Sequence, residues 1–214
     1  MKKILIADDH EIFRSGLKHI LSNMPFKFDI DEASNGREVM QKVSGDTYDM
    51  VLMDISMPGR NGIDILKQLK TYRPNLQVLI LSMYPEDQFA VRTLKAGAAG
   101  YLSKASKHDE LVKAIYKVLD GKKYISSSIA NRLALYISAD ESKSPHEILS
   151  AREYEVMCMT ASGKPVKQIA MELSLSSKTI STYRSRIMNK LKMDNVAQLI
   201  RYALNNRILN QLNK

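Results

Sequence analysis

Polar residues follow the short apolar segments in the first half of this 214-residue chain. They are Asp8 and Asp9 after the first segment, Asp54 after the third, Ser82 after the fourth, and Lys104 just beyond the fifth. Clustered carboxylates repel one another unless a cation offsets them, and a small oxygen-only set suits Mg²⁺ together with a phosphate. A lysine and a hydroxyl opposite the metal form a cradle for a phosphoryl group that a carboxylate can accept covalently. These five residues are therefore the candidate site.

The elements that position these residues alternate regularly over residues 1–120. Predicted strands cover residues 4–7, 28–33, 50–53, 78–81 and 98–102, and predicted helices cover residues 11–22, 36–44, 62–71, 86–96 and 107–119. Parallel strands need crossover connections that cover both sheet faces, so the alternation predicts a doubly wound α/β domain with a five-stranded parallel sheet. Ligands collect beyond the carboxyl ends of such strands, where the five polar residues should converge.

A linker and a helical domain follow. After Gly121, apolar residues at helical spacing predict one short helix, and the small polar segment 138–145 ends in the helix-breaking Pro145. Beyond residue 146 we predict four helices, over residues 150–162, 165–173 and 176–191 and from 195 onward. A tight turn at residues 174–176 predicts a helix-turn-helix. The predicted domains are residues 1–121, a linker at 122–145, and residues 146–214.

Local signals set the beginnings of three of these helices. Ser150 and Glu153 have the spacing of a capping box. Pro165 suits the first turn of the next helix. Either Ser176 or Ser177 can cap the third helix.

The basic charge lies in the C-terminal part of the chain. Of the net charge of +9, residues 121–214 contribute most, with 15 Lys and Arg against 7 Asp and Glu, whereas residues 1–120 carry 17 against 16. This asymmetry predicts a nucleic-acid or acidic-membrane partner, with a solvated basic face as the alternative. No apolar segment is long enough to span a bilayer, and the N-terminus lacks the pattern of a signal peptide. The single cysteine, Cys158, has apolar neighbours, so we expect a buried thiol and a cytoplasmic protein.

The predicted third helix separates an apolar face from a polar one. At 100° per residue, Ile180, Ile187 and Leu191 share one face, which we expect to pack inward. The opposite face presents Lys178, Ser181, Thr182, Ser185, Arg186 and Asn189. Short polar side chains let a helix approach base edges, while Lys and Arg neutralise phosphates. The pattern predicts a recognition helix, and a charged solvated helix is the alternative.

The candidate site resembles the receiver domain of two-component response regulators in the order and spacing of its residues. The matching segments are Asp8-Asp9, Asp54-Ile55-Ser56-Met57-Pro58-Gly59-Arg60-Asn61-Gly62, Ser82 and Tyr101-Leu102-Ser103-Lys104. The resemblance implies a CheY-like sheet with strand order 2-1-3-4-5 and Mg²⁺ as cofactor. It implies that Asp54 is the phosphoacceptor and that Asp9, Asp54 and the backbone carbonyl of Ser56 hold the metal, with Asp8 assisting through water.

The same resemblance assigns three switch residues. Lys104 pairs with the phosphoryl group, Ser82 hydrogen-bonds it after activation, and Tyr101 swings inward together with Ser82. An aspartyl nucleophile with Mg²⁺ also occurs in phosphatases of the haloacid-dehalogenase type, but those carry a second Asp two positions later, where this chain has Ser56. We therefore expect no enzyme acting on an external substrate, and only the self-dephosphorylation that a receiver implies.

The C-terminal domain resembles the LuxR-type helix-turn-helix. The resemblance rests on Leu149 to Glu153, Gly163-Lys164, Ile169-Ala170, Leu173 and Leu175 to Tyr183. It implies base contacts from Ser181, Thr182 and Ser185. It implies contacts nearer the DNA backbone from Lys178, Thr179, Arg184 and Arg186, of which Arg184 lies nearest the buried face. It implies dimerisation through Val196, Leu199, Ile200 and Ala203, with packing in the domain's own core as the alternative.

Receiver, linker and helix-turn-helix together resemble the NarL/FixJ class of transcriptional response regulators, and within it the virulence and fimbrial regulators of the BvgA type. The resemblance implies that a histidine kinase or a small phosphodonor phosphorylates Asp54. The switched receiver then controls homodimerisation and sequence-specific binding of double-stranded promoter DNA, with RNA polymerase as a candidate partner and no membrane partner. Two alternatives stay open: a phosphorylation-independent DNA-binding regulator, and a signalling adaptor without specific DNA binding.

Overall fold

The computed structural model divides the chain into two compact units, Met1–Asp140 and Glu141–Lys214. The structure describes residues 1–58, 62–84, 86–131, 145–173, 175–206 and 208. The N-terminal unit contains β1 (Lys2–Ala7), α1 (Glu11–Ser22), β2 (Phe28–Ala33), α2 (Gly36–Gly45), β3 (Met50–Asp54), α3 (Gly62–Tyr72), β4 (Gln77–Ser82), α4 (Glu86–Lys95), β5 (Gly100–Ser103) and α5 (His108–Leu119). The C-terminal unit contains the short 3₁₀-helix η1 (Pro145–Ile148), α7 (Ala151–Ala161), α8 (Val166–Glu172), α9 (Ser177–Leu191) and α10 (Val196–Asn205).

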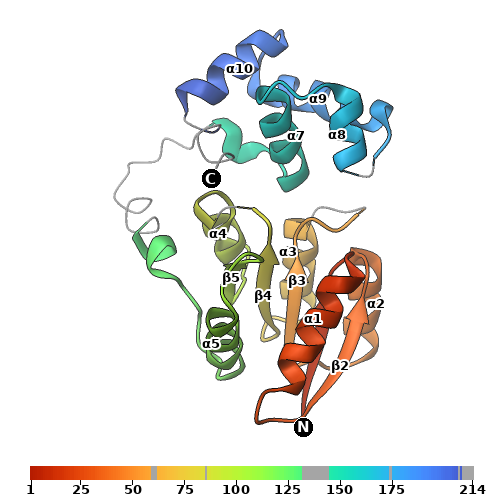
Figure 1. Ribbon diagram of the computed structural model, residues 1–214, viewed down its shortest axis with the longest axis vertical. Coiled ribbons are helices and arrows are strands. Elements are labelled where there is room, and N and C mark those ends of the chain that lie inside the picture. Colours follow the sequence, from red (N-terminus) through yellow and green to blue (C-terminus); the bar gives the residue numbers. More distant parts are fainter. Residues whose placement is uncertain (59–61, 85, 132–144, 174, 207, 209–214) are drawn as a thin grey trace. The chain divides into compact units, whose positions relative to one another are not determined.

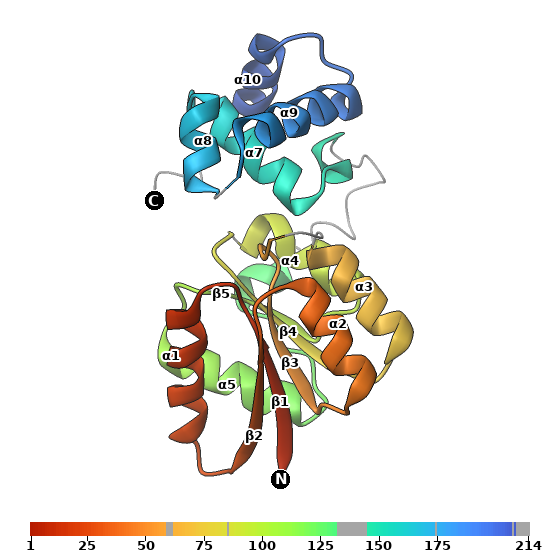
Figure 2. The ribbon, with the colours of Figure 1, turned by 90° about the vertical axis from the view of Figure 1, so that its right-hand side faces the viewer.

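The strands of the N-terminal unit form one parallel sheet in the order β2-β1-β3-β4-β5 (Figure 1). The predicted doubly wound fold and its strand order are therefore confirmed. Figure 2 shows α1 and α5 on one side of the sheet and α2 and α3 on the other. On the first side, Ile4 and Ile6 of β1 share a core cluster with Leu21 of α1 and Ile115 of α5. All residues of β3 are buried, as expected of a central strand that is covered on both faces.

Part of the segment that the sequence assigns to the linker packs against the N-terminal unit. Tyr124 is buried, and its backbone N–H donates to the carbonyl of Ala99 at 2.8 Å. Gly100 permits this close approach, because a Cβ there would lie 2.9 Å from the carbonyl oxygen of Tyr124. Residues 127–131 are helical, and the rest of the predicted short helix lies outside the described residues.

The C-terminal unit contains the helices that the sequence predicts, with small differences at their beginnings. Pro165 is the N-cap of α8, one position before the predicted first turn, because its ψ of 152° is extended. Ser176 caps α9, since its side chain accepts the N–H of Thr179 at 3.1 Å. The consecutive helices α8 and α9 agree with the predicted helix-turn-helix. The predicted tight turn at residues 174–176 includes residue 174, which lies outside the described residues.

Glu153 joins the beginning of α7 to α9. Its Oε2 accepts the N–H of Ser150 at 2.7 Å, while the Ser150 hydroxyl accepts the N–H of Glu153 at 3.2 Å, so the predicted capping box is confirmed. The Lys190 ammonium of α9 lies 2.6 Å from the same Oε2. Burial raises the pKa of Glu153, but the contacts from Lys190 and Ser150 outweigh it and leave the pKa below its usual value.

Replacing Glu153 by Gln is expected to lower the free energy of unfolding of the C-terminal unit by about 1–2 kcal/mol at neutral pH, because the charged hydrogen bonds weaken. The pKa of Glu153 is lowered on folding, so its contribution is present above the ordinary value of 4.5 and is lost as the pH falls through the lowered value. Urea unfolding of the full chain at neutral and acid pH measures both effects. The control is Glu172→Gln on the exposed surface of α8, and an equal loss in the two variants would contradict the assignment.

Candidate acidic site and nucleic-acid interface

Two buried carboxylates and a buried ammonium lie at the carboxyl edge of the sheet. Asp54 ends β3, Asp8 directly follows β1, and Lys104 directly follows β5. The Lys104 Nζ lies 2.6 Å from Oδ2 of Asp8 and 2.7 Å from Oδ2 of Asp54. The exposed fractions of these side chains are 5% for the lysine and 2% for each carboxylate. The structure thus brings three of the five predicted site residues into direct contact.

Burial and charge oppose each other in this group. Burial raises the pKa of Asp54, and attraction to Lys104 offsets only part of the effect, so the pKa lies above its usual value. Burial lowers the pKa of Lys104, but the carboxylates of Asp54 and Asp8 outweigh it and raise this pKa. One ammonium therefore neutralises the pair incompletely, and the site favours a second cation.

The side chains that could hold such a cation are Asp8, Asp9, His10 and Asp54, whose ligand atoms all lie within 4.8 Å of one another. Three of the four offer carboxylate oxygens, the hard ligands that Mg²⁺ takes. The backbone N–H of Ser56 donates to Oδ1 of Asp54 at 3.0 Å, which places the Ser56 backbone beside the group. The residues present therefore fit Mg²⁺.

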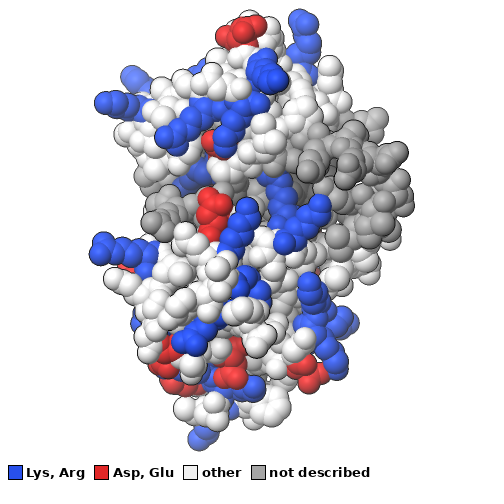
Figure 3. All heavy atoms as spheres, turned by 180° about the vertical axis from the view of Figure 1, so that it is seen from behind, with Lys and Arg blue, Asp and Glu red and all other residues white. Residues whose placement is uncertain are grey.

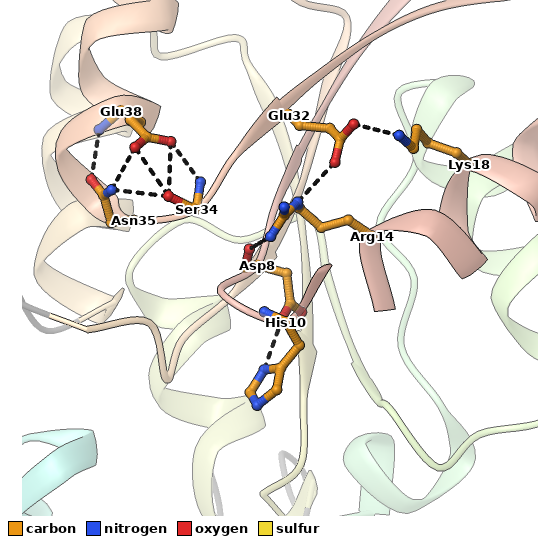
Figure 4. A network of polar contacts seen from close by, with 8 residues as sticks. All are labelled: Asp8, His10, Arg14, Lys18, Glu32, Ser34, Asn35 and Glu38. Carbon is orange, nitrogen blue, oxygen red and sulfur yellow. Dashed lines mark hydrogen bonds and ion pairs between the residues drawn. The ribbon is translucent and has the colours of Figure 1, made fainter. Parts of the chain in front are cut away.

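His10 is a member of this group that sequence reasoning missed. Its Nδ1 lies 3.2 Å from Oδ1 of Asp8 and 3.0 Å from Oδ1 of Asp9, and Figure 4 shows the ring beside Asp8. The only available signal was its position directly after the acidic pair at the end of the first apolar segment.

A second network holds the backbone at Asp8, as Figure 4 shows. Nη1 of Arg14 on α1 donates to the carbonyl oxygen of Asp8 at 2.8 Å, and its Nε donates to Glu32 of β2 at 2.8 Å. Lys18 contacts the other carboxylate oxygen of Glu32. The hydrogen bonds from Lys18 and Arg14 hold the pKa of Glu32 below its usual value. The position of Asp8 therefore depends on α1 and β2 as well as on Lys104.

Ser82 and Tyr101, the predicted switch residues, are buried and both contact Tyr84. The backbone N–H of Tyr84 donates to the Ser82 hydroxyl oxygen at 3.2 Å, and the Tyr101 hydroxyl donates to the Tyr84 carbonyl at 2.8 Å. The Lys104 N–H donates to the Ser82 carbonyl at 2.8 Å. The Tyr101 side chain has no exposed surface, so it occupies an inward position in this structure. These contacts join the strand end that carries Lys104 to the segment before α4.

In the C-terminal unit, α9 has one buried and one exposed face. Ile180, Ile187 and Leu191 are buried, as the helical spacing predicts. The exposed residues among the predicted DNA contacts are Lys178, Ser181, Thr182, Ser185 and Arg186. Thr179 and Arg184 are half-buried, and for Arg184 this agrees with its predicted position nearest the buried face.

Hydroxyl groups on the exposed face of α9 bond back to their own helix. Ser181 donates to the Ser177 carbonyl at 3.0 Å, Thr182 to the Lys178 carbonyl at 3.0 Å, and Ser185 to the Ser181 carbonyl at 3.1 Å. Because each proton points to the helix, the oxygen lone pairs are available as acceptors on the outer surface. In Figure 3, Lys and Arg side chains cover more of the visible surface of the C-terminal unit, which is drawn uppermost, than Asp and Glu side chains do. Acceptors and cations of this kind suit base edges and phosphates.

The four apolar residues of α10 that were predicted to form a dimer contact differ in how deeply they are buried. Leu199 and Ala203 have no exposed surface, and α10 packs against α7. The predicted dimer contact is therefore corrected for these two residues, because a fully buried side chain cannot reach a second chain. Their role is the alternative, packing in the domain's own core. Val196 and Ile200 are half-buried and stay predicted dimer contacts.

Comparisons with known proteins assign both units. Residues 4–116 match the response regulator receiver domain, and residues 147–203 match the luxR family of bacterial regulatory proteins. The response regulator UvrY of Escherichia coli K12 is 35% identical over 211 residues, which cover 98% of this chain and 97% of UvrY. A structure of RcsB from Salmonella enterica serovar Typhimurium, bound to promoter rprA in the presence of the phosphomimetic BeF₃⁻, is 27% identical with a TM-score of 0.58 and coverages of 94% and 98%. A structure of two RcsB dimers bound to two parallel DNAs is 28% identical with a TM-score of 0.59 and coverages of 95% and 98%.

Within the described part of the chain, no helix combines the length and the apolar character needed to cross a membrane. The two matched families follow one another in the order that the sequence motifs predict, and the similarity to UvrY extends over nearly the whole chain. The chain therefore belongs to the two-component response regulators of the NarL/FixJ class, DNA-binding transcription regulators that join a receiver domain to a LuxR-type helix-turn-helix.

Proposed function

We propose that Asp54 accepts a phosphoryl group from a histidine kinase or a small phosphodonor. A carboxylate oxygen of Asp54 attacks the phosphorus, the bond from phosphorus to the donor's leaving group breaks, and an acyl phosphate forms. The observation that carries this proposal is the buried Asp54 carboxylate with the Lys104 ammonium 2.7 Å away. A fixed cation at this distance stabilises the charge of the transferring group.

The remaining acidic residues hold Mg²⁺, which supplies further positive charge to the phosphoryl group. Asp9, Asp54 and the backbone carbonyl of Ser56 are the ligands, and Asp8 acts through water. The dense group of carboxylate oxygens supports this assignment. Water that attacks the phosphorus of the acyl phosphate returns Asp54 to its free form, so self-dephosphorylation is the one hydrolytic reaction of the site.

Phosphorylation changes the contacts of Ser82 and Tyr101. A phosphoryl group brings a charge of about −1.5 to −2 and strong acceptors, which favour a state with Lys104 and the Ser82 hydroxyl directed at it. Both switch residues contact Tyr84, so a shift of one is coupled to the other and to the segment before α4. The changed receiver face promotes homodimerisation, with Val196 and Ile200 of α10 as contacts between the two C-terminal units.

Incubation of the full chain with acetyl phosphate and Mg²⁺ is expected to add one phosphoryl group, and EDTA is expected to prevent the addition because the carboxylates then face the anionic donor without the metal. Intact-mass spectrometry measures the adduct, and light scattering measures association on the same samples. An adduct accompanied by dimers supports the proposal. An adduct without a change in association contradicts the dimer step, and no adduct in the presence of Mg²⁺ contradicts transfer from a small phosphodonor.

In the DNA-bound dimer, the two α9 helices enter successive major grooves about 10 bp apart. Ser181, Thr182 and Ser185 contact bases. Lys178, Thr179, Arg184 and Arg186 contact the DNA backbone, and RNA polymerase is a candidate partner of the bound dimer. The exposed hydroxyl acceptors of α9 support this arrangement. The similarity to RcsB, a relative whose structure is bound to a promoter, also supports it.

Thr182→Ala is expected to weaken binding to a specific site by about 1–2 kcal/mol, or roughly 5- to 30-fold, because one base contact is lost. Fluorescence anisotropy with a duplex selected from random DNA, and with a scrambled duplex, measures the two affinities. Phosphorylation and non-specific binding should not change. Thr71→Ala is a matched control, since the Thr71 hydroxyl of α3 also donates to the carbonyl four residues earlier. Equal affinity of Thr182→Ala and wild type for the selected duplex would remove Thr182 from the base contacts.

A further inference from the structure

We propose that His10 is an additional metal ligand of the acidic site, and that its imidazole makes the site select Zn²⁺-type transition-metal ions more strongly than carboxylates alone would. The inference rests on the proposed function, because it concerns the same metal site that serves Asp54. A metal-binding role for His10 is not part of the acidic motif formed by Asp8, Asp9 and Asp54.

The spacing of the ligand atoms is the first argument. Nδ1 of His10 lies 3.0 Å from Oδ1 of Asp9 and 3.2 Å from Oδ1 of Asp8. Adjacent ligands around an ion with metal–ligand distances of about 2.1 Å lie about 3.0 Å apart in an octahedron, and slightly farther apart in a tetrahedron. The imidazole nitrogen and the Asp9 oxygen therefore have the mutual distance of two ligands in one coordination sphere, and Asp8, which acts through water, lies beside them.

The second argument is that Lys104 and His10 contact different carboxylate oxygens. Lys104 contacts Oδ2 of Asp8 and Oδ2 of Asp54, whereas His10 faces Oδ1 of Asp8. The ammonium and the imidazole thus use different oxygens, so a metal ion on the His10 side does not have to displace Lys104. Lys104 already forms ion pairs with the two buried carboxylates of Asp8 and Asp54. Asp9, whose side chain is 31% exposed, adds a third negative charge on the solvent-exposed side of the site.

The local backbone holds His10 in place. His10 is the N-cap residue of α1, and its N–H donates to Oδ1 of Asp8 at 2.9 Å. Arg14, one turn later in α1, fixes the Asp8 carbonyl, as Figure 4 shows. The His10 side chain itself is 69% exposed, so an ion from solvent can reach the ring. A fixed backbone with an accessible ring is the arrangement that a ligand to an exchangeable ion requires.

The types of ligand atom determine which metal ions gain affinity from His10. Imidazole nitrogen suits Zn²⁺, Ni²⁺ and Cu²⁺, whereas Mg²⁺ prefers oxygen ligands and retains several waters. A site with three carboxylates and one imidazole therefore gains affinity for Zn²⁺ from His10 and gains little for Mg²⁺. At comparable free concentrations Zn²⁺ should displace Mg²⁺ from this receiver.

Isothermal titration calorimetry of the full chain with ZnCl₂ and, separately, MgCl₂ at neutral pH tests the proposal. The variant is His10→Asn, because the Asn amide can still donate to the two carboxylates but has no imidazole lone pair. We expect the Zn²⁺ affinity to fall by about 10- to 100-fold, and the Mg²⁺ affinity to stay within about twofold. His19→Asn is the control, since His19 is exposed on the same helix and should leave both affinities unchanged.

Two outcomes would overturn the proposal: equal Zn²⁺ affinities of wild type and His10→Asn, or equal losses for Zn²⁺ and Mg²⁺, which would make His10 a residue that positions Asp8. Phosphorylation of the wild type by acetyl phosphate with Mg²⁺ is measured in parallel. Absence of that adduct contradicts transfer from a small phosphodonor alone, whereas an unchanged Zn²⁺ affinity contradicts the His10 assignment alone. The two failures are therefore distinguishable.

Discussion

Asp54→Asn is expected to abolish phosphorylation by acetyl phosphate and by a histidine kinase while the receiver stays folded. The Asn amide has nearly the same shape and still accepts the Ser56 N–H, which lies 3.0 Å from Oδ1 in the wild type. It lacks the anionic oxygen that attacks phosphorus. Lys104 keeps its ion pair with Asp8 at 2.6 Å, so the substitution leaves no buried ammonium without a counterion.

Asp9→Asn is the matched control for this loss. It removes the same charge from the same acidic group, but from a carboxylate that is 31% exposed and that we assign to the metal rather than to the phosphoryl group. Its adduct should form slowly and recover as the Mg²⁺ concentration is raised. Intact-mass spectrometry over time compares the three proteins. A normal adduct on Asp54→Asn would refute the phosphoacceptor assignment, and an equally complete loss in Asp9→Asn at high Mg²⁺ would remove the distinction between the two roles.

The sequence was sufficient to predict the acidic site because a parallel sheet imposes strong geometry on the ends of its strands. Asp8, Asp54 and Lys104 are far apart in the chain, yet each follows an apolar segment, and parallel strands place such positions at one edge. The structure brings the Lys104 ammonium within 2.7 Å of a carboxylate oxygen of Asp8 and of Asp54. The strand order required more than the alternation of elements, and it came from the resemblance to receiver domains.

Other features depend on contacts that no local pattern encodes. His10 is a single polar residue at the start of a helix, and only the fold shows that its ring turns toward Asp8 and Asp9. The bond from Arg14 to Glu32 depends on β2 lying beside β1, and a charged residue on a half-exposed edge strand has no diagnostic spacing. An apolar stripe likewise shows that a helix packs against something, but not whether the partner is its own domain or a second chain.

Double charge reversal on α9, Lys178→Glu with Arg186→Glu, is expected to weaken DNA binding more than about 100-fold at 0.1 M salt. Both side chains are exposed on the face that carries the hydroxyl acceptors. Each Lys or Arg at a phosphate releases a condensed counterion, so the loss of two contacts removes an electrostatic contribution that does not depend on the base sequence. The new carboxylates also repel the phosphates. Specific and scrambled duplexes should therefore lose affinity together.

The salt dependence separates this effect from a loss of base contacts. The plot of log affinity against log salt concentration should become less steep by about 2 in the double variant, since each phosphate contact contributes about 0.9. Thr182→Ala should keep the wild-type slope, because a hydroxyl releases no counterion. The charge-matched control, Lys113→Glu with Lys117→Glu, changes two exposed lysines of α5 in the receiver. An equal loss of affinity in that control would mean that total charge, rather than the position of Lys178 and Arg186 on α9, governs binding.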